Sequence, residues 1–164
     1  MAKVLVVPLM QKFIYLKNRY PMIIKEITTL TPTIQTAIQH FIDLLVTTPY
    51  TASNETLTAL VESENSHLFL TFDEAENIMG MLTVGMYYSP TGKKAWIEDV
   101  VVDDTFRGQG IGEKLVQHAI EFVKAKQVDL LMLTSHPSRI AANKLYPRVG
   151  FNKRETNVYK MPIK

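Results

Sequence analysis

The clearest candidate for chemistry is a glycine-rich run between a predicted strand and a predicted helix. Three glycines fall within five positions, in the order Arg107, Gly108, Gln109, Gly110, Ile111 and Gly112. Glycine lets the backbone turn tightly, and the N-terminus of the following helix offers unpaired N–H groups with a partial positive charge. The Arg107 guanidinium adds a fork suited to phosphate oxygens. The run predicts a phosphate or diphosphate site, with a purely structural turn as the alternative.

A dinucleotide-binding loop has similar glycines, but its surroundings differ from those found here. That loop has the form G-x-G-x-x-G, follows the first strand of a parallel unit and has an acidic residue about 20 positions later. In this chain the spacing is G-x-G-x-G, the preceding strands have antiparallel character and no Walker lysine follows. The dinucleotide interpretation is therefore the weaker one.

The elements that must position this run follow from the periodicity of apolar residues. Strands are predicted at residues 23–28, 67–72, 78–88, 94–102, 128–134 and 158–163. Helices are predicted after the starts at Thr31 and Ser53, and at residues 112–126 and 139–149. The almost unbroken apolar content of residues 128–134 predicts a central strand covered on both faces. The order, antiparallel hairpins and then β-α-β-α-β, predicts one α/β domain.

Composition limits the classes of function. The 164 residues fit one domain, and the net charge of +2 comes from interspersed basic and acidic residues, which disfavours nucleic acid as a partner. The absence of cysteine excludes a thiolate zinc site and a cysteine nucleophile and fits a reducing cytoplasm. The apolar stretch at residues 4–10 is too short for a membrane span, which needs ~20 apolar residues. We therefore expect a cytoplasmic protein without a membrane partner.

Residues 97–151 resemble the GNAT superfamily of CoA-dependent N-acetyltransferases. The Arg-x-x-Gly-x-Gly form at Arg107 is similar to the acyl-CoA signature of that family, and Asn143, Tyr146 and Gly150-Phe151 match downstream positions. The resemblance covers roughly residues 23–163 and is weak before residue 65. It implies an α+β type of α/β fold, with a mixed central sheet of about six to seven strands flanked by about four helices. Residues 22–164 would form this domain, and residues 1–21 an N-terminal extension.

The resemblance also implies an acetyl-CoA site. The amides of residues 107–112 would hold the CoA diphosphate, and Asn143 would contact the cofactor. Tyr146 would contact or protonate the departing CoA thiolate; packing in the core is its alternative role. A bulge in the preceding strand would splay it from the next one. Backbone pairing with the pantetheine arm would fall on Val100, Val101 and Val102.

Amide formation from a thioester needs a neutral amine, so a group must accept a proton. Glu98 is the first candidate for the general base, with Asp99 as the competitor and as a contact for the substrate amine. Strand alternation places these two carboxylates on opposite faces, so that one would face the cleft. Either carboxylate could instead pair with a basic residue. The Val100 amide is a candidate oxyanion donor.

Two further residues are candidates for contacts with the acceptor. His136 follows an apolar strand and would sit at the mouth of the cleft, although a loop that enters a helix collects such residues for structural reasons. Tyr87, together with Tyr88, would line the acceptor pocket; the alternative is that one of the two faces the core and its neighbour faces solvent. The other three histidines have no ligand spacing, so no metal site is predicted.

The sequence thus predicts transfer of an acetyl group from acetyl-CoA to a primary amine of a small molecule, by direct attack in a ternary complex. A protein or peptide amine is the alternative acceptor, and a non-catalytic acyl-CoA-binding module is the alternative class. A nicotinamide-dependent oxidoreductase would instead lack affinity for CoA. The resemblance adds a homodimer as a possibility, although no residue of the sequence marks an interface.

Overall fold

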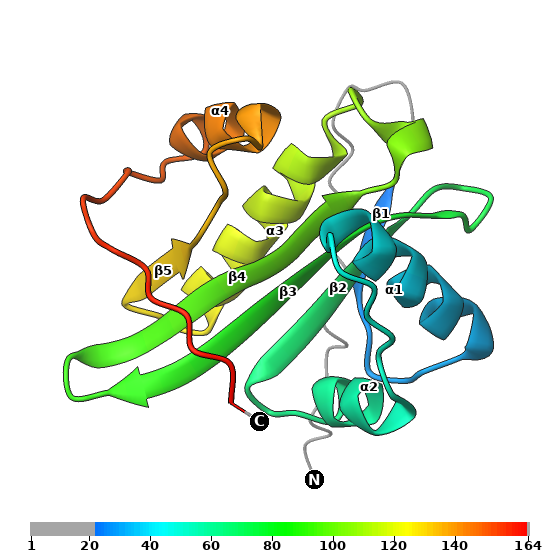
Figure 1. The fold of residues 1–164 in the computed structure, drawn as a ribbon, viewed down its shortest axis with the longest axis horizontal. Helices are drawn as coiled ribbons and strands as arrows, with labels where there is room; N and C mark the ends of the chain where they lie inside the picture. Colours follow the sequence, from blue (N-terminus) through cyan, green and yellow to red (C-terminus); the bar gives the residue numbers. More distant parts are fainter. Residues whose placement is uncertain (1–21, 164) are drawn as a thin grey trace, which may run out of the picture.

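A mixed five-stranded sheet organises the structure, a computed structural model that describes residues 22–163 (Figure 1). The strands are β1 (Ile23–Glu26), β2 (Ser66–Phe72), β3 (Ile78–Ser89), β4 (Gly92–Val102) and β5 (Leu130–Leu133). They lie in chain order across the sheet. The first four strands pair antiparallel, and β5 runs parallel to β4. The predicted extension at residues 1–21 lies outside the described residues.

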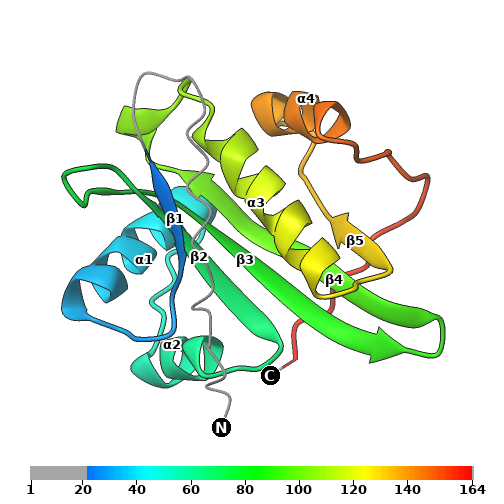
Figure 2. The ribbon, with the colours of Figure 1, turned by 180° about the vertical axis from the view of Figure 1, so that it is seen from behind.

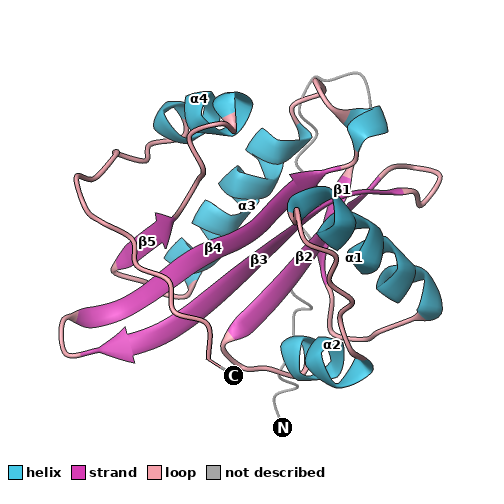
Figure 3. Ribbon diagram, in the orientation of Figure 1, coloured by secondary structure: helices cyan, strands magenta, loops and turns pink. Residues whose placement is uncertain are grey.

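Helices cover both faces of this sheet. The helices α1 (Pro32–Leu45) and α2 (Asn54–Val61) lie in front of it in Figure 1, and α3 (Ile111–Ala125) lies behind it, as the reverse view shows (Figure 2). A 3-10 turn, η1 (Asp104–Phe106), joins β4 to α3, and α4 (Ile140–Arg148) lies beyond the end of β5 (Figure 3). The two predicted helix starts are confirmed, because Thr31 and Ser53 accept hydrogen bonds from Ile34 N and Thr56 N, each at 3.2 Å.

The central strands are buried on both faces, which fixes the sheet as a rigid base for the site. In β2, Leu68 and Leu70 pack with α1 and α2, whereas Phe69 packs with the residues around α3. Each such side chain contributes roughly 1.5–3 kcal/mol through its burial. The cluster of side chains packed with α1 and the cluster packed with α3 both include residues of β2 and β3. The two helices are therefore held on opposite sides of the same strands.

The strand β4 leaves its neighbour β5 halfway along its length. Pairing with β5 covers only Lys94 to Ile97 of β4. On the other edge, the register with β3 shifts, so that Glu98 faces Thr83 but Val101 faces Met81. The two residues between, Asp99 and Val100, therefore form a bulge. The sheet opens on the β5 side at the point where this bulge bends β4.

Two expectations about strands are wrong. Residues 158–163 form no strand, and Val158, Tyr159, Met161 and Ile163 are 73–88% exposed, so the described part of the sheet has five strands rather than six or seven. The strand β5 is also not central: it closes one edge of the described sheet, and Leu130 is 41% exposed. Its residues Leu131 and Leu133 are partly buried and pack against the core on one face.

Candidate active site

The glycine run forms an open turn at the start of α3. Gly108 and Gly110 both have a φ of +78°, which favours glycine, and Gly110 is the N-cap of α3 without a side-chain capping bond. A Cβ atom placed on either glycine would meet no atom within 4 Å. The start of α3 thus has no side-chain cap, and the two glycines beside it border open space. This arrangement fits an anionic group held by main-chain donors.

Arg107 stands at this turn, tethered to its neighbours. Its Nη2 pairs with Asp104 Oδ1, and its Nε donates a hydrogen bond to Val102 O at 3.4 Å. The side chain remains more than half exposed. The guanidinium is therefore held beside the turn and can still present further N–H donors to a phosphate.

The segment before the turn is fixed to α1 by a contact that the sequence did not reveal. Asp103 Oδ1 accepts the Thr105 N–H at 2.8 Å, and Asp103 Oδ2 lies 2.7 Å from His40 Nε2. The hydrogen bonds from Thr105 and His40 hold the pKa of Asp103 below its usual value. His40 lies 63 positions away from Asp103 in the sequence, and no local pattern marks such a long-range partner.

A cavity of about 270 Å³ lies where β4 and β5 separate. Its walls come from β4, the end of β5, the following loop, the start and middle of α4, and the C-terminal end of α1. The lining residues are Leu45, Val46, Ile97, Glu98, Asp99, Val100, Leu133, Thr134, His136, Arg139 and Tyr146. The cavity brings together both candidate bases, the candidate acid and one residue of the predicted pantetheine strand.

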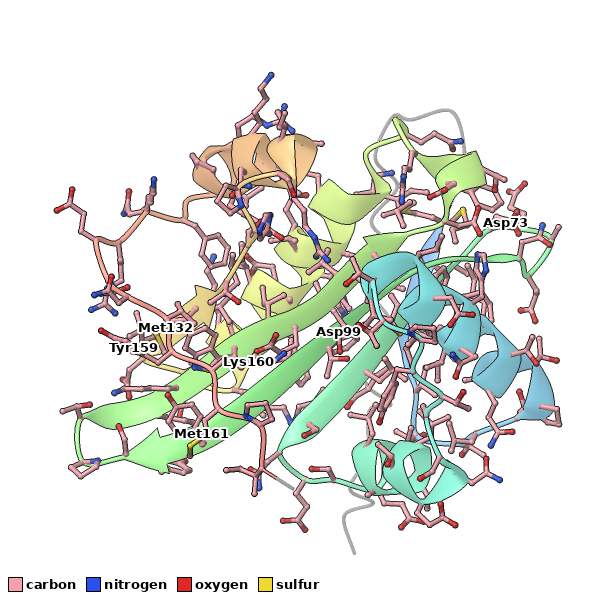
Figure 4. The ribbon with its side chains drawn as sticks, in the orientation of Figure 1. Asp73, Asp99, Met132, Tyr159, Lys160 and Met161 are labelled. Carbon is pink, nitrogen blue, oxygen red and sulfur yellow. The ribbon has the colours of Figure 1, made fainter. Side chains whose placement is uncertain are left out.

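Both carboxylates reach this cavity, contrary to the expectation that alternation would separate them. The bulge gives Asp99 a φ of +53° and interrupts the alternation of side chains after Glu98. Figure 4 shows Asp99 on β4 near the end of α1. Burial raises the pKa of Glu98 and of Asp99; the neighbouring Asp99 charge raises that of Glu98 further, whereas Arg139 opposes the shift at Asp99.

Tyr146 projects from α4 into the same cavity. Its side chain is buried, with 9% exposed, and its ring packs edge-on against Phe151 with the ring centroids 6.0 Å apart. Burial raises the pKa of the phenol, and the Arg139 charge opposes this rise. Tyr146 is thus both a core residue and a cavity residue, so the two roles considered for it are compatible.

Other predicted residues lie elsewhere or have different partners. Tyr87 is near the far end of β3, outside the lining, and its hydroxyl accepts a hydrogen bond from Trp96 Nε1 at 3.4 Å. Asn143 Nδ2 donates to His136 O at 2.9 Å and to Arg139 O at 3.0 Å, which ties the loop to α4. His136 does line the cavity, with Nδ1 accepting the Ser138 N–H at 3.2 Å. The side chains of Val101 and Val102 belong to the core rather than the cavity.

Arg139 is the cavity residue that sequence reasoning missed. It occupies the N-cap position of α4 without a side-chain capping bond. A cation at a helix N-terminus opposes the helix dipole and needs another reason to be there. This unfavourable placement was the feature of the sequence that could have indicated a role for Arg139 in the site. Among the described residues, its guanidinium makes one hydrogen bond, from Nη2 to Leu45 O at 3.3 Å.

Residues 22–163 lack two other features. None of the helices there is both long and apolar enough to cross a membrane. In the same part of the chain, no group of three or more histidine, aspartate or glutamate side chains is arranged to hold a metal ion.

Several known proteins are similar in sequence to this chain. A ribosomal protein bS18 alanine N-acetyltransferase from Haemophilus ducreyi is 31% identical over 98 residues, which are 58% of this chain and 65% of that protein. An N-acetylaspartate synthetase from Danio rerio is 37% identical over 62 residues, which are 37% of this chain and 22% of that protein. The chain thus spans less than two thirds of the length of each of these relatives.

A solved structure extends the likeness to most of the fold. An aminoglycoside acetyltransferase from an uncultured soil sample, in complex with trehalose, superimposes with a TM-score of 0.75 at 20% identity. The match covers 87% of this chain and 97% of that one. Residues 37–151, from the middle of α1 to the residue after Gly150, match the acetyltransferase (GNAT) family. With the family match covering well over half of its length, the chain belongs to the acetyltransferase (GNAT) family.

Proposed function

We propose that this chain transfers an acetyl group from acetyl-CoA to a primary amine of a small molecule, by direct attack in a ternary complex. The observation that carries the proposal is the separation of β4 from β5. One continuous strand leads from the two carboxylates to the uncapped glycine turn, and the cavity lies beside it. Both substrates of such a transfer could therefore meet along a single edge.

The described residues fit acetyl-CoA in two places. The turn at residues 107–112 has open space above Gly108 and Gly110, where main-chain N–H groups and Arg107 would hold the diphosphate. The edge of β4 beyond Ile97 has no strand partner on the β5 side among residues 22–163. That edge, at Val100 to Val102, offers main-chain groups to the amides of the pantetheine arm, as an added strand would. Acetyl-CoA supplies the activated acyl group.

The residues of the cavity fit the proton transfers of the reaction. Glu98 would take a proton from the incoming ammonium, directly or through a water, with Asp99 as the competing base; burial raises the pKa of both. The Val100 N–H would stabilise the charge that develops on the thioester oxygen. Tyr146, whose phenol has a pKa raised by burial, would donate a proton to the CoA thiolate.

A protein N-terminus is the second candidate acceptor. It is favoured by the likeness to the Haemophilus enzyme, whose name states that it acts on an alanine of a ribosomal protein. Against it, the cavity is small and is lined by α1 and the loop after β5. The names of two other similar proteins, an N-acetylaspartate synthetase and an aminoglycoside acetyltransferase, point to small acceptors.

An assay for thiol release from acetyl-CoA, over a panel of small amines and N-terminal peptides, tests the proposal. We expect turnover with at least one small amine and a lower kcat/KM for peptides. Calorimetry with CoA is the companion measurement. Binding of CoA without thiol release from any amine would indicate a non-catalytic acyl-CoA-binding module, and no binding at all would remove the CoA assignment.

A further inference from the structure

The cavity carries opposite charges on different walls. Glu98 and Asp99 come from the bulge of β4, whereas Arg139 and His136 come from the loop between β5 and α4. Among the described residues, no nitrogen of Arg139 lies within 4.0 Å of a carboxylate oxygen. The guanidinium and the carboxylates thus face one space without forming an ion pair.

The two sides influence each other only across this space. The Arg139 charge lowers the pKa of Asp99 without a direct ion pair, and no hydrogen bond contributes to the shift in pKa at Glu98 or Asp99. One of the five N–H donors of the Arg139 guanidinium bonds to Leu45 O. A ligand with a cationic amine and an anionic group would satisfy both sides at once.

The dimensions of the cavity restrict such a ligand. The cavity, of about 270 Å³, must also admit the thioester. A compact acceptor, with its two charges a few bonds apart, suits this space better than a long one. A polycationic acceptor would place a second cation toward Arg139. An amine without an anionic group would give the guanidinium no partner.

We infer that the acceptor is a small zwitterion, an amine that bears a carboxylate or phosphate group, and that Arg139 binds this anionic group while the amine lies toward Glu98 and Asp99. This inference rests on the proposed acetyl transfer. The acceptor ammonium loses one proton to the base, and its nitrogen forms the amide bond as the carbon–sulfur bond breaks. The CoA thiolate leaves with a proton from Tyr146, and the second nitrogen proton restores the phenol. The anionic group takes no part in the bond changes and selects the acceptor.

Matched pairs of amines test the inference. One pair is an amino acid and its carboxamide, and the other is an aminoalkyl phosphate and the corresponding amino alcohol, each assayed by thiol release. Loss of a charge-assisted hydrogen bond typically corresponds to about a ten- to hundredfold change. We expect the anionic member of at least one pair to have a kcat/KM higher by that factor, and the responding pair identifies the anion.

Variants at Arg139 locate the source of the preference. Arg139→Gln should raise KM about ten- to hundredfold more for the anionic member of a pair than for its neutral partner. Arg139→Lys, which keeps the charge but loses the planar fork, should give an intermediate value. Arg154→Gln removes a similar exposed charge outside the cavity and is the matched control. Thermal melting of each variant checks that the fold is kept.

The results separate the two proposals. Equal use of neutral and anionic members, faster use of a diamine, or a preference that survives Arg139→Gln would each contradict the zwitterion and leave acetyl transfer standing. No thiol release with any amine, despite bound acetyl-CoA, would contradict both.

Discussion

Glu98 and Asp99 share the cavity because Asp99 adopts a left-handed backbone conformation. The sequence showed two adjacent carboxylates, and the period of a regular strand predicted opposite faces. A bulge adds one residue to one strand and interrupts that period, and it is set by pairing with β3, which is not local in sequence. The residue types were therefore predictable, but their convergence was not. The same holds for Arg139, whose role depends on residues that only the fold brings near.

Neutral substitutions should identify the base. We expect Glu98→Gln to lower kcat/KM by about 10²–10⁴-fold if Glu98 is the base, with Asp99→Asn causing the smaller loss. Asn tolerates the φ of +53°, so Asp99→Asn isolates the charge. Because the pKa of each carboxyl is raised, the acidic limb of the wild-type pH profile should lie above the usual range of a glutamate. A larger loss with Asp99→Asn would reverse the assignment.

The same variants should change stability with a defined sign. A carboxyl whose pKa is raised in the folded state contributes stability below its ordinary pKa, and this contribution is lost as pH rises through the folded value. Glu98→Gln should therefore increase the free energy of unfolding at pH 7, by at most about 1 kcal/mol because water screens this site. Near pH 4 the gain should largely vanish. Urea unfolding at both pH values measures the difference.

A substitution of Tyr146 should distinguish its proposed role in proton transfer from its role in packing. Tyr146→Phe removes the hydroxyl but keeps the ring against Phe151, so melting should change little. If the phenol donates a proton to the leaving thiolate, kcat should fall about 10²-fold or more while the KM for acetyl-CoA stays similar. Stopped-flow measurement of thiol release gives the rate of the chemical step. Unchanged turnover would leave Tyr146 as a core residue only.

At the scale of elements, local signals predicted most of the structure. The capping residues Thr31 and Ser53 start their helices as expected, and the strands of both hairpins form. Residues 158–163 do not form the predicted strand, although they are rich in apolar side chains. A strand forms only where a neighbouring strand offers an edge at the right register, and that condition is not written in the segment itself. The apolar run of β5 led to the wrong prediction of a central strand for a related reason. The sequence of the run does not tell whether one face or both faces of the strand are covered.

The turn before α3 gives a matched pair of glycine substitutions. Gly110 has a φ of +78°, whereas Gly112 has no positive φ, and a Cβ there would meet Val102 Cγ2 at an ordinary 3.6 Å. We expect Gly110→Ala to cost about 1–2 kcal/mol of backbone strain and to raise the KM for acetyl-CoA. Gly112→Ala should change stability by less than about 1 kcal/mol. Calorimetry with CoA, together with melting curves, distinguishes the two, and equal effects would contradict the role of the left-handed turn.

At the scale of the molecule, one contact couples the two sides of the site. His40 on α1, whose C-terminal end borders the cavity, lies 2.7 Å from Asp103, which precedes the glycine turn. A contact across 63 positions depends on the completed sheet, which is why no motif disclosed it. The contact thereby connects the helix that borders the cavity to the turn proposed for the cofactor.

His40→Ala tests this coupling. Because the pair is partly exposed, its loss should raise the KM for acetyl-CoA by only about two- to fivefold, with kcat within about twofold. Lys124→Ala removes an exposed ion pair to Glu121 on α3, away from the turn, and is the control. Steady-state kinetics at varied acetyl-CoA gives both constants. A change in kcat alone, or an equal effect of Lys124→Ala, would show that the contact does not position the turn.

The parting of β4 from β5 also bears on how such a protein could diversify. The activated donor would rest on main-chain groups of one strand and one helix start, which most side-chain replacements leave intact. Selection of the acceptor would instead depend on the end of α1 and the loop before α4, where single replacements alter charge and shape. New acceptors could therefore be acquired through changes in these two segments, while the machinery for the thioester is inherited unaltered.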